Sequence, residues 1–180
     1  MRYFFDTEFI DSPWSLTLIS IGIVAEDGRE FYAVNSLAYS FNASEWVQAN
    51  VYTKLQPKRH PVYREQTPDE IRAGLLLFIG DDPQPEFWAY YGAFDWVALC
   101  WLMGGMLNLP RGWYWICREL RTALDQSGFA ELKDSGRDDE HNALADARWI
   151  RLAFEANVNE AARTTIHRPS VCGAGEEPGT

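Results

Sequence analysis

Near the start of the chain, apolar residues fall into runs with the composition of β-strands. The first run, residues 2–6, is short and aromatic, and the second, residues 15–25 (SLTLISIGIVA), is longer and rich in β-branched residues. Residues 26–29 (EDGR) are typical of a hairpin turn and lead into a third run at residues 30–34 (EFYAV). Three such runs in succession predict an antiparallel meander of three strands.

Helical patterns follow and alternate with further strands. The clearest helix start is a capping box, in which Thr67 is the N-cap, Pro68 occupies the first helical position and Glu70 completes the box. This helix is expected to run to Ile79 and to end at Gly80. The other expected elements are a helix at 43–51, a strand at 86–91, a helix at 93–103, a strand at 113–117, and helices at 118–126 and 141–157. A meander followed by alternating strands and helices indicates an α/β fold with a mixed sheet flanked by helices.

The length of the chain and the composition of its last part indicate one domain followed by a tail. With 180 residues, of which 47% are hydrophobic, the chain can build one buried core, which excludes a disordered protein. We expect the domain to occupy residues 1–158. Residues 159–180 are rich in arginine, proline, glycine and acids, and we expect them to form a flexible tail.

Membrane insertion and disulfide bonding are both disfavoured. The longest uncharged run, residues 96–110, is too short for a spanning helix and contains glycine and proline. Cys100, Cys117 and Cys172 cannot all pair within one chain, and their spacing is not that of metal ligands. We therefore expect a soluble cytoplasmic protein whose thiols are structural.

The net charge of −10 limits the contacts that the protein can make with nucleic acid. An acidic surface repels phosphate, which argues against binding along a duplex. A small cleft that admits a few nucleotides is compatible with this charge, because bound divalent ions would neutralise part of it.

Four carboxylates stand out by their positions. Asp6 and Glu8 are two residues apart at the end of the first strand and so point to the same side of the sheet, although a solvated strand end also explains such a pair. Asp95 and Asp146 each lie on the apolar face of a helix, with apolar residues three, four and seven positions later. An ionised acid in such a position is costly unless it is paired or bound to a metal.

Arginine partners are the structural alternative to a metal for these helical acids. Arg148 and Arg151 lie on the same expected helix as Asp146, but both project from other faces of that helix. We therefore favour a metal site, while the paired alternative stays open.

An all-oxygen set of ligands suits Mg²⁺, with Mn²⁺ as a substitute, and no Cys/His cluster suggests structural zinc. Carboxylates on a strand end and two helices can hold two ions for in-line displacement at a phosphate. His141 stands near the start of the helix that carries Asp146, where it can act as a general base on the attacking water. His60 lies in a basic loop and His167 in the tail, without such neighbours.

Three segments resemble the exonuclease motifs of the DEDDh family of 3′-to-5′ exonucleases. They are Asp6-Thr7-Glu8, Phe94-Asp95 after an aromatic strand, and residues 141–147 (HNALADA). Each motif is modest alone, but the three occur in the order and spacing of the family, and the resemblance covers residues 1–158. This family includes RNase T, oligoribonuclease and the proofreading subunits of DNA polymerases, and the resemblance implies an RNase H-like fold.

Within the family, residues 6–10 (DTEFI), 18–32 (LISIGIVAEDGREFY) and 95–100 (DWVALC) are most similar to RNase AS, a group of small actinobacterial exoribonucleases that prefers polyadenylate. The resemblance implies a homodimer that hydrolyses RNA from a single-stranded 3′ end and releases nucleoside 5′-monophosphates. The chain departs from this group most at residues 36–67, at 128–140 and in the tail. Base preference and contacts between subunits can differ there.

The resemblance also implies a role for each site residue. Two Mg²⁺ ions are expected to be held by Asp6, Glu8, Asp95 and Asp146, with Asp6 bridging both ions. His141 is expected to be the general base.

Aromatic residues beside these acids are candidates for contacts with the terminal nucleotides. Phe9 and Phe94 adjoin the first and second motifs, and together with Glu8 they are expected to bind the 3′ end. Stacking of a base on an aromatic ring is tolerant of sequence. The alternative is that both rings belong to the core.

Two other functions are compatible with the sequence. A DNA exonuclease of the same fold is one, because selection for ribose depends on contacts to the 2′-hydroxyl that no short motif reveals. The other is a non-catalytic protein that binds nucleic acid. Inactive copies commonly lose one of the five expected catalytic residues, and all five are present here, which disfavours this second function.

Overall fold

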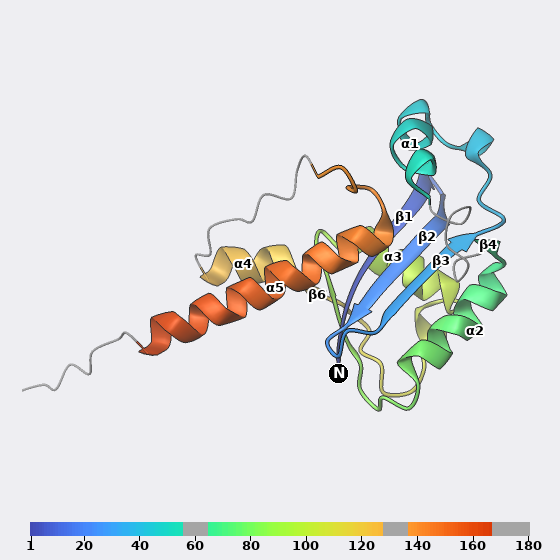
Figure 1. The fold of residues 1–180 in the computed structure, drawn as a ribbon. Helices are drawn as coiled ribbons and strands as arrows, with labels where there is room; N and C mark the ends of the chain where they lie inside the picture. The colour runs from blue at the N-terminus through green and yellow to red at the C-terminus, as the bar shows by residue number, and fades with distance from the viewer. Residues whose placement is uncertain (56–64, 128–136, 167–180) are drawn as a thin grey trace, which may run out of the picture.

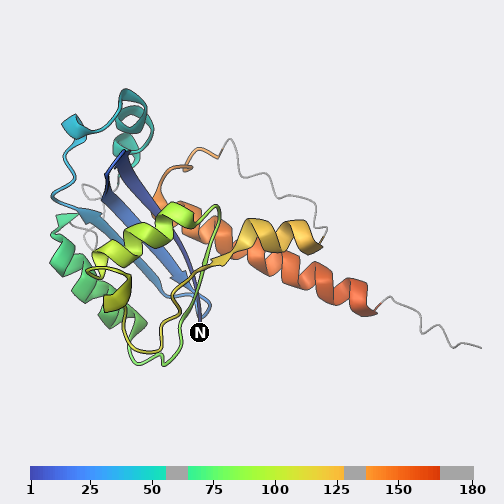
Figure 2. The same ribbon diagram turned by 180° about the vertical axis from the view of Figure 1, so that it is seen from behind.

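The computed structural model describes residues 1–55, 65–127 and 137–166 of the chain. The expected basic loop at 56–64, most of the expected polar loop before the last helix, and residues 167–180 of the expected tail lie outside the described residues. The described part consists of a six-stranded sheet with helices on both of its faces (Figures 1 and 2). The predicted α/β class is confirmed.

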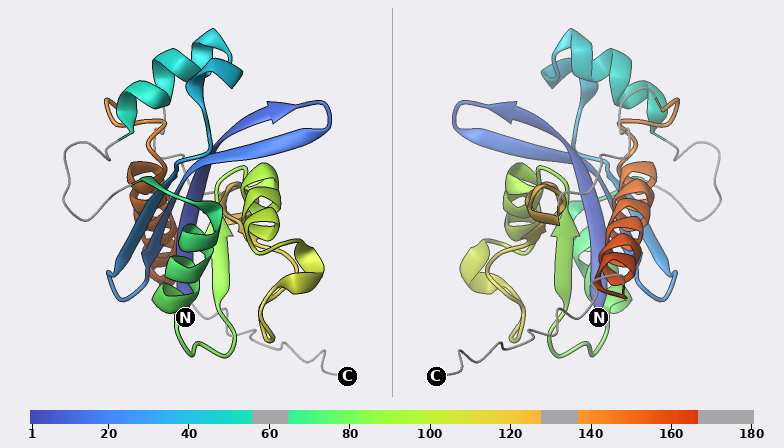
Figure 3. Two further views of the ribbon diagram at one scale, coloured as in Figure 1. Left: turned by 90° about the vertical axis from the view of Figure 1, so that its right-hand side faces the viewer. Right: turned by 90° about the vertical axis from the view of Figure 1, so that its left-hand side faces the viewer.

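The sheet is mixed, as predicted, and contains the expected meander. The antiparallel strands of the meander are β1 (Arg2–Ser12), β2 (Ser15–Ala25) and β3 (Glu30–Asn35). The strand order is β4-β3-β2-β1-β5-β6, in which three short strands, each parallel to its neighbours, complete the sheet: β4 (Glu65–Gln66), β5 (Glu86–Ala89) and β6 (Arg118–Glu119). The hairpin of β1 and β2 extends beyond the other strands (Figure 3).

Helices α2 and α3 cover one face of the sheet, and α4 and α5 cover the other (Figures 1 and 2). The helices are α1 (Glu45–Asn50), α2 (Pro68–Ile79), α3 (Ala93–Leu102), α4 (Leu120–Ser127) and α5 (Ala143–Ile166), with short 3₁₀ turns η1 (Ser40–Asn42), η2 (Tyr52–Lys54) and η3 (Met106–Asn108). The predicted capping box starts α2: the amide of Glu70 donates to Thr67 Oγ1 over 3.3 Å, and the amide of Thr67 donates to Glu70 Oε2 over 2.9 Å.

Alternation along β1 separates its side chains between the two cores. Tyr3 and Phe5 are buried in the core under α2 and α3, whereas Phe4 is buried in the core under α4 and α5. Since successive side chains of a strand point to opposite faces, Asp6 and Glu8 project to the side of α5 and Thr7 to the side of α3. The pattern of β1 thus determines which helix each acid meets.

Strand β1 is longer than predicted. It continues past Asp6 to Ser12, because residues 9–12 pair with the start of β2 in a hairpin closed by Pro13 and Trp14. The register shifts once, between Glu8 and Phe9. Asp6 and Glu8 therefore lie within the strand rather than at its end.

Other boundaries also differ from the prediction. The expected strand at 86–91 ends at Ala89, and the expected helix at 118–126 begins at Leu120. Residues 113–117 are not a strand: Trp113 is buried in the core while Trp115 and Ile116 are exposed, and the strand pairing with β5 falls instead on Arg118–Glu119. The last helix begins at Ala143, after His141, and continues to Ile166. No helix in the described ranges is long and apolar enough to cross a membrane.

Candidate active site

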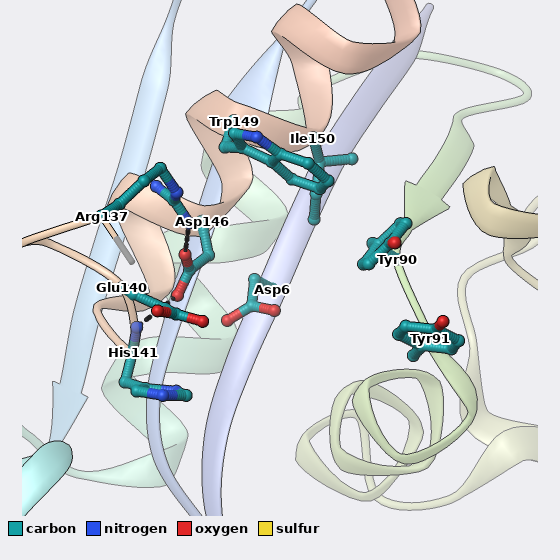
Figure 4. A pocket seen from close by; sticks show the side chains of 9 residues that line it. All are labelled: Asp6, Tyr90, Tyr91, Arg137, Glu140, His141, Asp146, Trp149 and Ile150. Carbon is teal, nitrogen blue, oxygen red and sulfur yellow. Dashed lines mark hydrogen bonds and ion pairs between the residues drawn. The ribbon is translucent and has the colours of Figure 1, made fainter. Parts of the chain in front are cut away.

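An acidic cluster lies where α5 meets β1. Carboxylate oxygens of Asp6, Glu8 and Asp146 lie within 4.8 Å of one another. The carboxylates of Asp6 and Asp146 point toward one another and line a pocket of about 190 Å³, which is also lined by Tyr90, Tyr91, Arg137, Glu140, His141, Trp149 and Ile150 (Figure 4). Each acid of the cluster is partly exposed, so an ion or a substrate can reach it.

A glycine in β2 brings the two halves of this cluster together. Gly22 is the partner of Asp6 in the sheet, and a Cβ atom on Gly22 would overlap the carbonyl carbon and oxygen of Ala143 and the amide nitrogen of Leu144. The missing side chain lets the first turn of α5 lie directly on the sheet. Asp146, in the same first turn of the helix, is thereby placed beside Asp6.

The electrostatics of the cluster disfavour three ionised carboxylates without a cation. Burial raises the pKa of Asp6 well above its ordinary value, and the charges of Asp95, Glu8 and Asp146 raise it further. Burial and the charges of Asp146 and Asp95 raise the pKa of Glu8 to about 8, although the ammonium group of Lys54 acts in the opposite direction. Hard, crowded oxygen ligands of this kind fit a divalent ion such as Mg²⁺.

Asp95 lies beside this cluster rather than within it. It is 6% exposed in the first turn of α3, and its Oδ1 accepts hydrogen bonds from the amide of Thr7 over 2.8 Å and from Thr7 Oγ1 over 2.6 Å. Burial raises the pKa of Asp95 to about 6, and these hydrogen bonds oppose the rise. The charge of Asp95 in turn raises the pKa of Asp6. The four predicted acids therefore share one electrostatic environment, with Asp95 facing β1 from the side of Thr7.

Asp146 has an arginine partner that the sequence analysis missed. Its Oδ1 is paired with Arg137, and its Oδ2 accepts from the amide of His141 over 2.9 Å. Burial raises the pKa of Asp146, and the guanidinium group of Arg137 opposes that rise. The arginines considered from the sequence have other partners: Arg148 pairs with Glu30 and Arg151 with Glu155. Arg137 lies before the helix, where no periodic pattern could connect it to Asp146.

His141 precedes α5 and lines the same pocket as Asp6 and Asp146 (Figure 4). Its φ angle is 66°, which few residues other than glycine adopt, and this conformation keeps it out of the helix. The imidazole ring lies 4.9 Å from the ring of Trp46 in an edge-to-face arrangement. His60 and His167 fall outside the described residues.

Phe9 and Phe94 stack on each other, with ring centroids 5.7 Å apart and an angle of 25° between the rings. Phe94 is 56% exposed, so the alternative that it is a core residue does not hold. It lines an open groove together with Trp14, Val97 and Trp101. The two predicted rings thus form an accessible aromatic surface where the motifs of Asp6 and Asp95 meet.

Comparisons with known proteins show the family of the chain. The family model described as the 3′-5′ exoribonuclease Rv2179c-like domain matches residues 1–157, a range that contains all five expected catalytic residues. The 3′-5′ exoribonuclease Rv2179c of Mycobacterium tuberculosis (strain ATCC 25618 / H37Rv) is 43% identical over 150 residues, or 82% of this chain and 88% of that protein. The 3′-5′ exoribonuclease MT2234.1 of M. tuberculosis (strain CDC 1551 / Oshkosh) has the same identity and coverage. The chain therefore belongs to the Rv2179c-like family and is a 3′-to-5′ exoribonuclease.

Proposed function

We propose that this exoribonuclease uses two divalent ions, held by Asp6, Glu8, Asp95 and Asp146, and that His141 is its general base. The observation that carries the proposal is the convergence of Asp6, Glu8 and Asp146, whose oxygens lie within 4.8 Å of one another. The raised pKa values of these acids support it, because a cation would relieve their mutual repulsion. Mg²⁺, with Mn²⁺ as a substitute, is the ion that such oxygen ligands favour.

The reaction would be hydrolysis of the last phosphodiester bond of an RNA strand. Bound divalent ions would stabilise charge on the scissile phosphate and lower the pKa of the attacking water. His141 would accept a proton from that water while the oxygen of the water forms a bond to phosphorus. The bond between phosphorus and O3′ of the preceding nucleotide would break, and O3′ would take up a proton from solvent to become the new 3′-hydroxyl. The terminal nucleotide would be released as a nucleoside 5′-monophosphate.

The substrate would be a single-stranded 3′ end, with a preference for polyadenylate. The stacked and accessible rings of Phe9 and Phe94 suit the terminal bases. Glu8, as a member of the acidic cluster, would contact the terminal ribose as well as an ion. The similarity to RNase AS around residues 6–10 and 95–100 supports the preference for adenine.

Digestion of a 5′-labelled RNA tests polarity and metal dependence. With Mg²⁺ the label should appear in a ladder that shortens one nucleotide at a time, and the reaction should stop with excess EDTA or at a blocked 3′ end. Full activity in EDTA would contradict the metal-dependent mechanism, and cutting of a circular RNA would reveal an endonuclease.

Matched substrates test the choice of sugar and base. Polyadenylate should be degraded faster than polyuridylate or polycytidylate of equal length, and a DNA strand of the same sequence more slowly than RNA. Equal rates on the three RNA homopolymers would remove the proposed adenine preference. A faster rate on DNA would favour a deoxyribonuclease as the main activity.

The role of His141 is tested by comparing it with a metal ligand. His141→Ala should lower kcat by about a hundred- to ten-thousand-fold, the usual contribution of a general base, and leave Mg²⁺ affinity measured by calorimetry unchanged. Asp6→Asn should weaken Mg²⁺ binding as well as abolish turnover. A His141→Ala protein with the wild-type rate would falsify the assignment of the base.

We also propose that the enzyme works as a homodimer in the cytoplasm. Free thiols at Cys100 and Cys117 suit a reducing compartment. Large apolar residues such as Trp14, Leu77 and Leu107 are more than 80% exposed and are candidates for coverage by a second copy. Light scattering coupled to gel filtration should give about twice the mass of one chain, and a monomer at micromolar concentration would contradict the dimer.

A further inference from the structure

The segment between β3 and β4 reaches the turn that carries His141. In this segment, α1 follows an N-cap at Ser44, whose hydroxyl accepts from the amide of Val47 over 3.2 Å. Val51 is 1% exposed, and Tyr52 donates to the carbonyl oxygen of Ala38 over 2.8 Å, which joins the end of α1 to the residues that follow β3. Figures 1 and 3 show α1 at the end of the sheet near the start of α5.

Two hydrogen bonds join this segment to the residues on either side of His141. Lys54 Nζ donates to the carbonyl oxygen of Glu140 over 2.6 Å, and Asn142 Nδ2 donates to the carbonyl oxygen of Lys54 over 3.0 Å. The amide of His141 itself donates to Asp146 over 2.9 Å. The backbone of His141 is therefore held from three directions, which explains how its positive φ angle is maintained.

The imidazole ring of His141 meets Trp46, on the first turn of α1. The centroids of the two rings are 4.9 Å apart and the rings are inclined at 78°, which is the edge-to-face arrangement that aromatic pairs favour. Trp46 is 55% exposed and does not belong to the core, so its burial does not account for its place. Among the residues that the structure describes, its side-chain ring contact is with the ring of His141.

We propose that Trp46 is a positioning residue, which restricts the orientation of the His141 ring at the mouth of the acidic pocket. The inference rests on the proposed role of His141 as the general base. A base works only when its nitrogen is aligned with the proton that it accepts, and the backbone bonds fix the Cα of His141 but not the torsions of its side chain. The edge-to-face contact with Trp46 supplies such a restraint on the ring.

Nuclear magnetic resonance tests the contact without reference to activity. The Hε1 resonance of His141 can be assigned by its loss in His141→Gln and should be displaced by the ring current of Trp46. Trp46→Ala should move this resonance toward the value of an exposed histidine, and Trp46→Phe should move it less. Trp115→Ala is the matched control, because Trp115 is also exposed, at 62%. An unchanged resonance in Trp46→Ala would overturn the inference.

A double-mutant cycle tests the function of the contact. Trp46→Ala should lower kcat about three- to tenfold with KM unchanged, the size expected when one aromatic contact is lost. Trp46→Phe should recover part of the rate. In a His141→Ala background the same substitution should have no further effect, because Trp46 acts only through the histidine.

The rival role for Trp46 is direct stacking with an RNA base, and the cycle distinguishes the two. If Trp46 binds RNA, Trp46→Ala will raise KM by the same factor whether or not His141 is present, and the positioning role is overturned. If His141→Ala has the wild-type rate, the proposed base is wrong. If His141→Ala is slow but Trp46→Ala keeps the wild-type kcat, only the positioning role fails.

Discussion

The carboxyl group of Asp6 lies near the negative charges of Asp95, Glu8 and Asp146, and each of them raises its pKa. In most folded proteins a partly buried carboxylate is paired and adds to stability. Here the acids repel one another, and Arg137 compensates only in part. Without a metal, this repulsion lowers the free energy of unfolding. The same crowding of negative charge makes the site suitable for a cation.

The first prediction concerns Asp6→Asn. The amide has almost the same size as the acid but carries no charge, so the metal-free variant should melt at a higher temperature than wild type near neutral pH, while exonuclease activity should be lost. Added Mg²⁺ should raise the melting temperature of wild type by mass action and that of the variant much less. Differential scanning fluorimetry with and without EDTA measures both effects.

Asp11→Asn is the control for this prediction. Asp11 lies on the same strand and is exposed, so the same chemical change should leave activity and the Mg²⁺ response intact. Equal Mg²⁺-dependent stabilisation of wild type and Asp6→Asn would show that Asp6 holds no ion.

Reasoning from single residues identifies a candidate where a side chain contradicts its surroundings. Asp95 and Asp146 were detectable because each interrupts an apolar helical face, and Asp6 and Glu8 because they share one face of a strand. Arg137 and Trp46 carry no such contradiction: an arginine in a loop and a tryptophan on a short helix are ordinary. Their roles arise from contacts between distant segments, which one sequence does not reveal.

At the scale of elements, the approach of α5 to β2 depends on Gly22. Gly22→Ala would force a methyl group into the backbone of Ala143 and Leu144, which cannot move as a flexible side chain does. We expect the free energy of unfolding to fall by about 1 to 3 kcal/mol or more, the usual effect of overpacking. The exonuclease rate should fall even under conditions where the variant stays folded, because a displaced α5 would carry Asp146 away from Asp6.

Gly74→Ala is the matched control for Gly22→Ala. Gly74 lies within α2, where a Cβ atom would come within 3.2 Å of the ring edge of Phe31, a side chain that can adjust. Alanine also favours the helical backbone by about 0.5 to 1 kcal/mol, so stability should change little and activity not at all. Urea unfolding and a digest of labelled RNA measure both variants, and equal behaviour of the pair would contradict the account of Gly22.

Glu119 supplies the start of α3 with a cap from another strand. The N-cap of this helix, Gly92, has no side chain to offer, and Glu119 accepts hydrogen bonds from the amides of Gly92 over 2.8 Å, Tyr91 over 3.0 Å and Arg121 over 3.0 Å. Tyr91 has a φ angle of 55°, a strained conformation that these bonds help to hold. The carboxylate thus fixes the helix that carries Asp95.

Glu119→Ala should therefore lower the free energy of unfolding by about 1 to 3 kcal/mol, through the lost cap and the amides left without a partner. The rate of RNA digestion should also fall, because Asp95 loses its fixed position. Glu119→Gln keeps one acceptor oxygen, so its free energy of unfolding should lie between those of wild type and Glu119→Ala. Wild-type stability of Glu119→Ala in urea would show that water replaces the cap.

The elements themselves were predictable to the extent that they rest on local signals. The bounds of β2 and α2 follow from a run rich in β-branched residues and from a capping box, and the structure confirms both. The end of β1 was wrong because its acids interrupt the apolar pattern, although the hairpin continues through them. The prediction of a strand at 113–117 was wrong because the aromatic residues of this range suggested pairing. The strand that pairs with β5 begins at Arg118, directly after the predicted range.

At the scale of the whole molecule, the raised pKa values predict how the metal-free protein responds to pH. Glu8 and Asp95 lose their protons near pH 8 and 6 in the folded protein, but near their ordinary values of 4.5 and 3.8 in the unfolded chain. Between about pH 4 and 8 the folded state thus binds more protons than the unfolded state. The contribution of these groups to stability should decrease as pH rises through this range.

Calorimetric melting in EDTA at a series of pH values checks this prediction. Glu8→Gln removes one of the titrating groups, so its stability relative to wild type should increase from pH 4 to pH 8. With saturating Mg²⁺, the stability difference between the two proteins should change much less between pH 4 and pH 8, since a bound cation favours the ionised carboxylates. A constant difference between the two proteins over the whole range would contradict the raised pKa of Glu8.

The close contact of α5 with Gly22 also bears on how the enzyme is made. A ribosome synthesises β1 first and the residues of α5 only after most of the domain has emerged. Asp6 and Glu8 are therefore synthesised long before Asp146 and His141. Under the proposed mechanism, the site is complete only once α5 has packed on the sheet at Gly22, so the order of synthesis makes this docking the step that would switch the nuclease on.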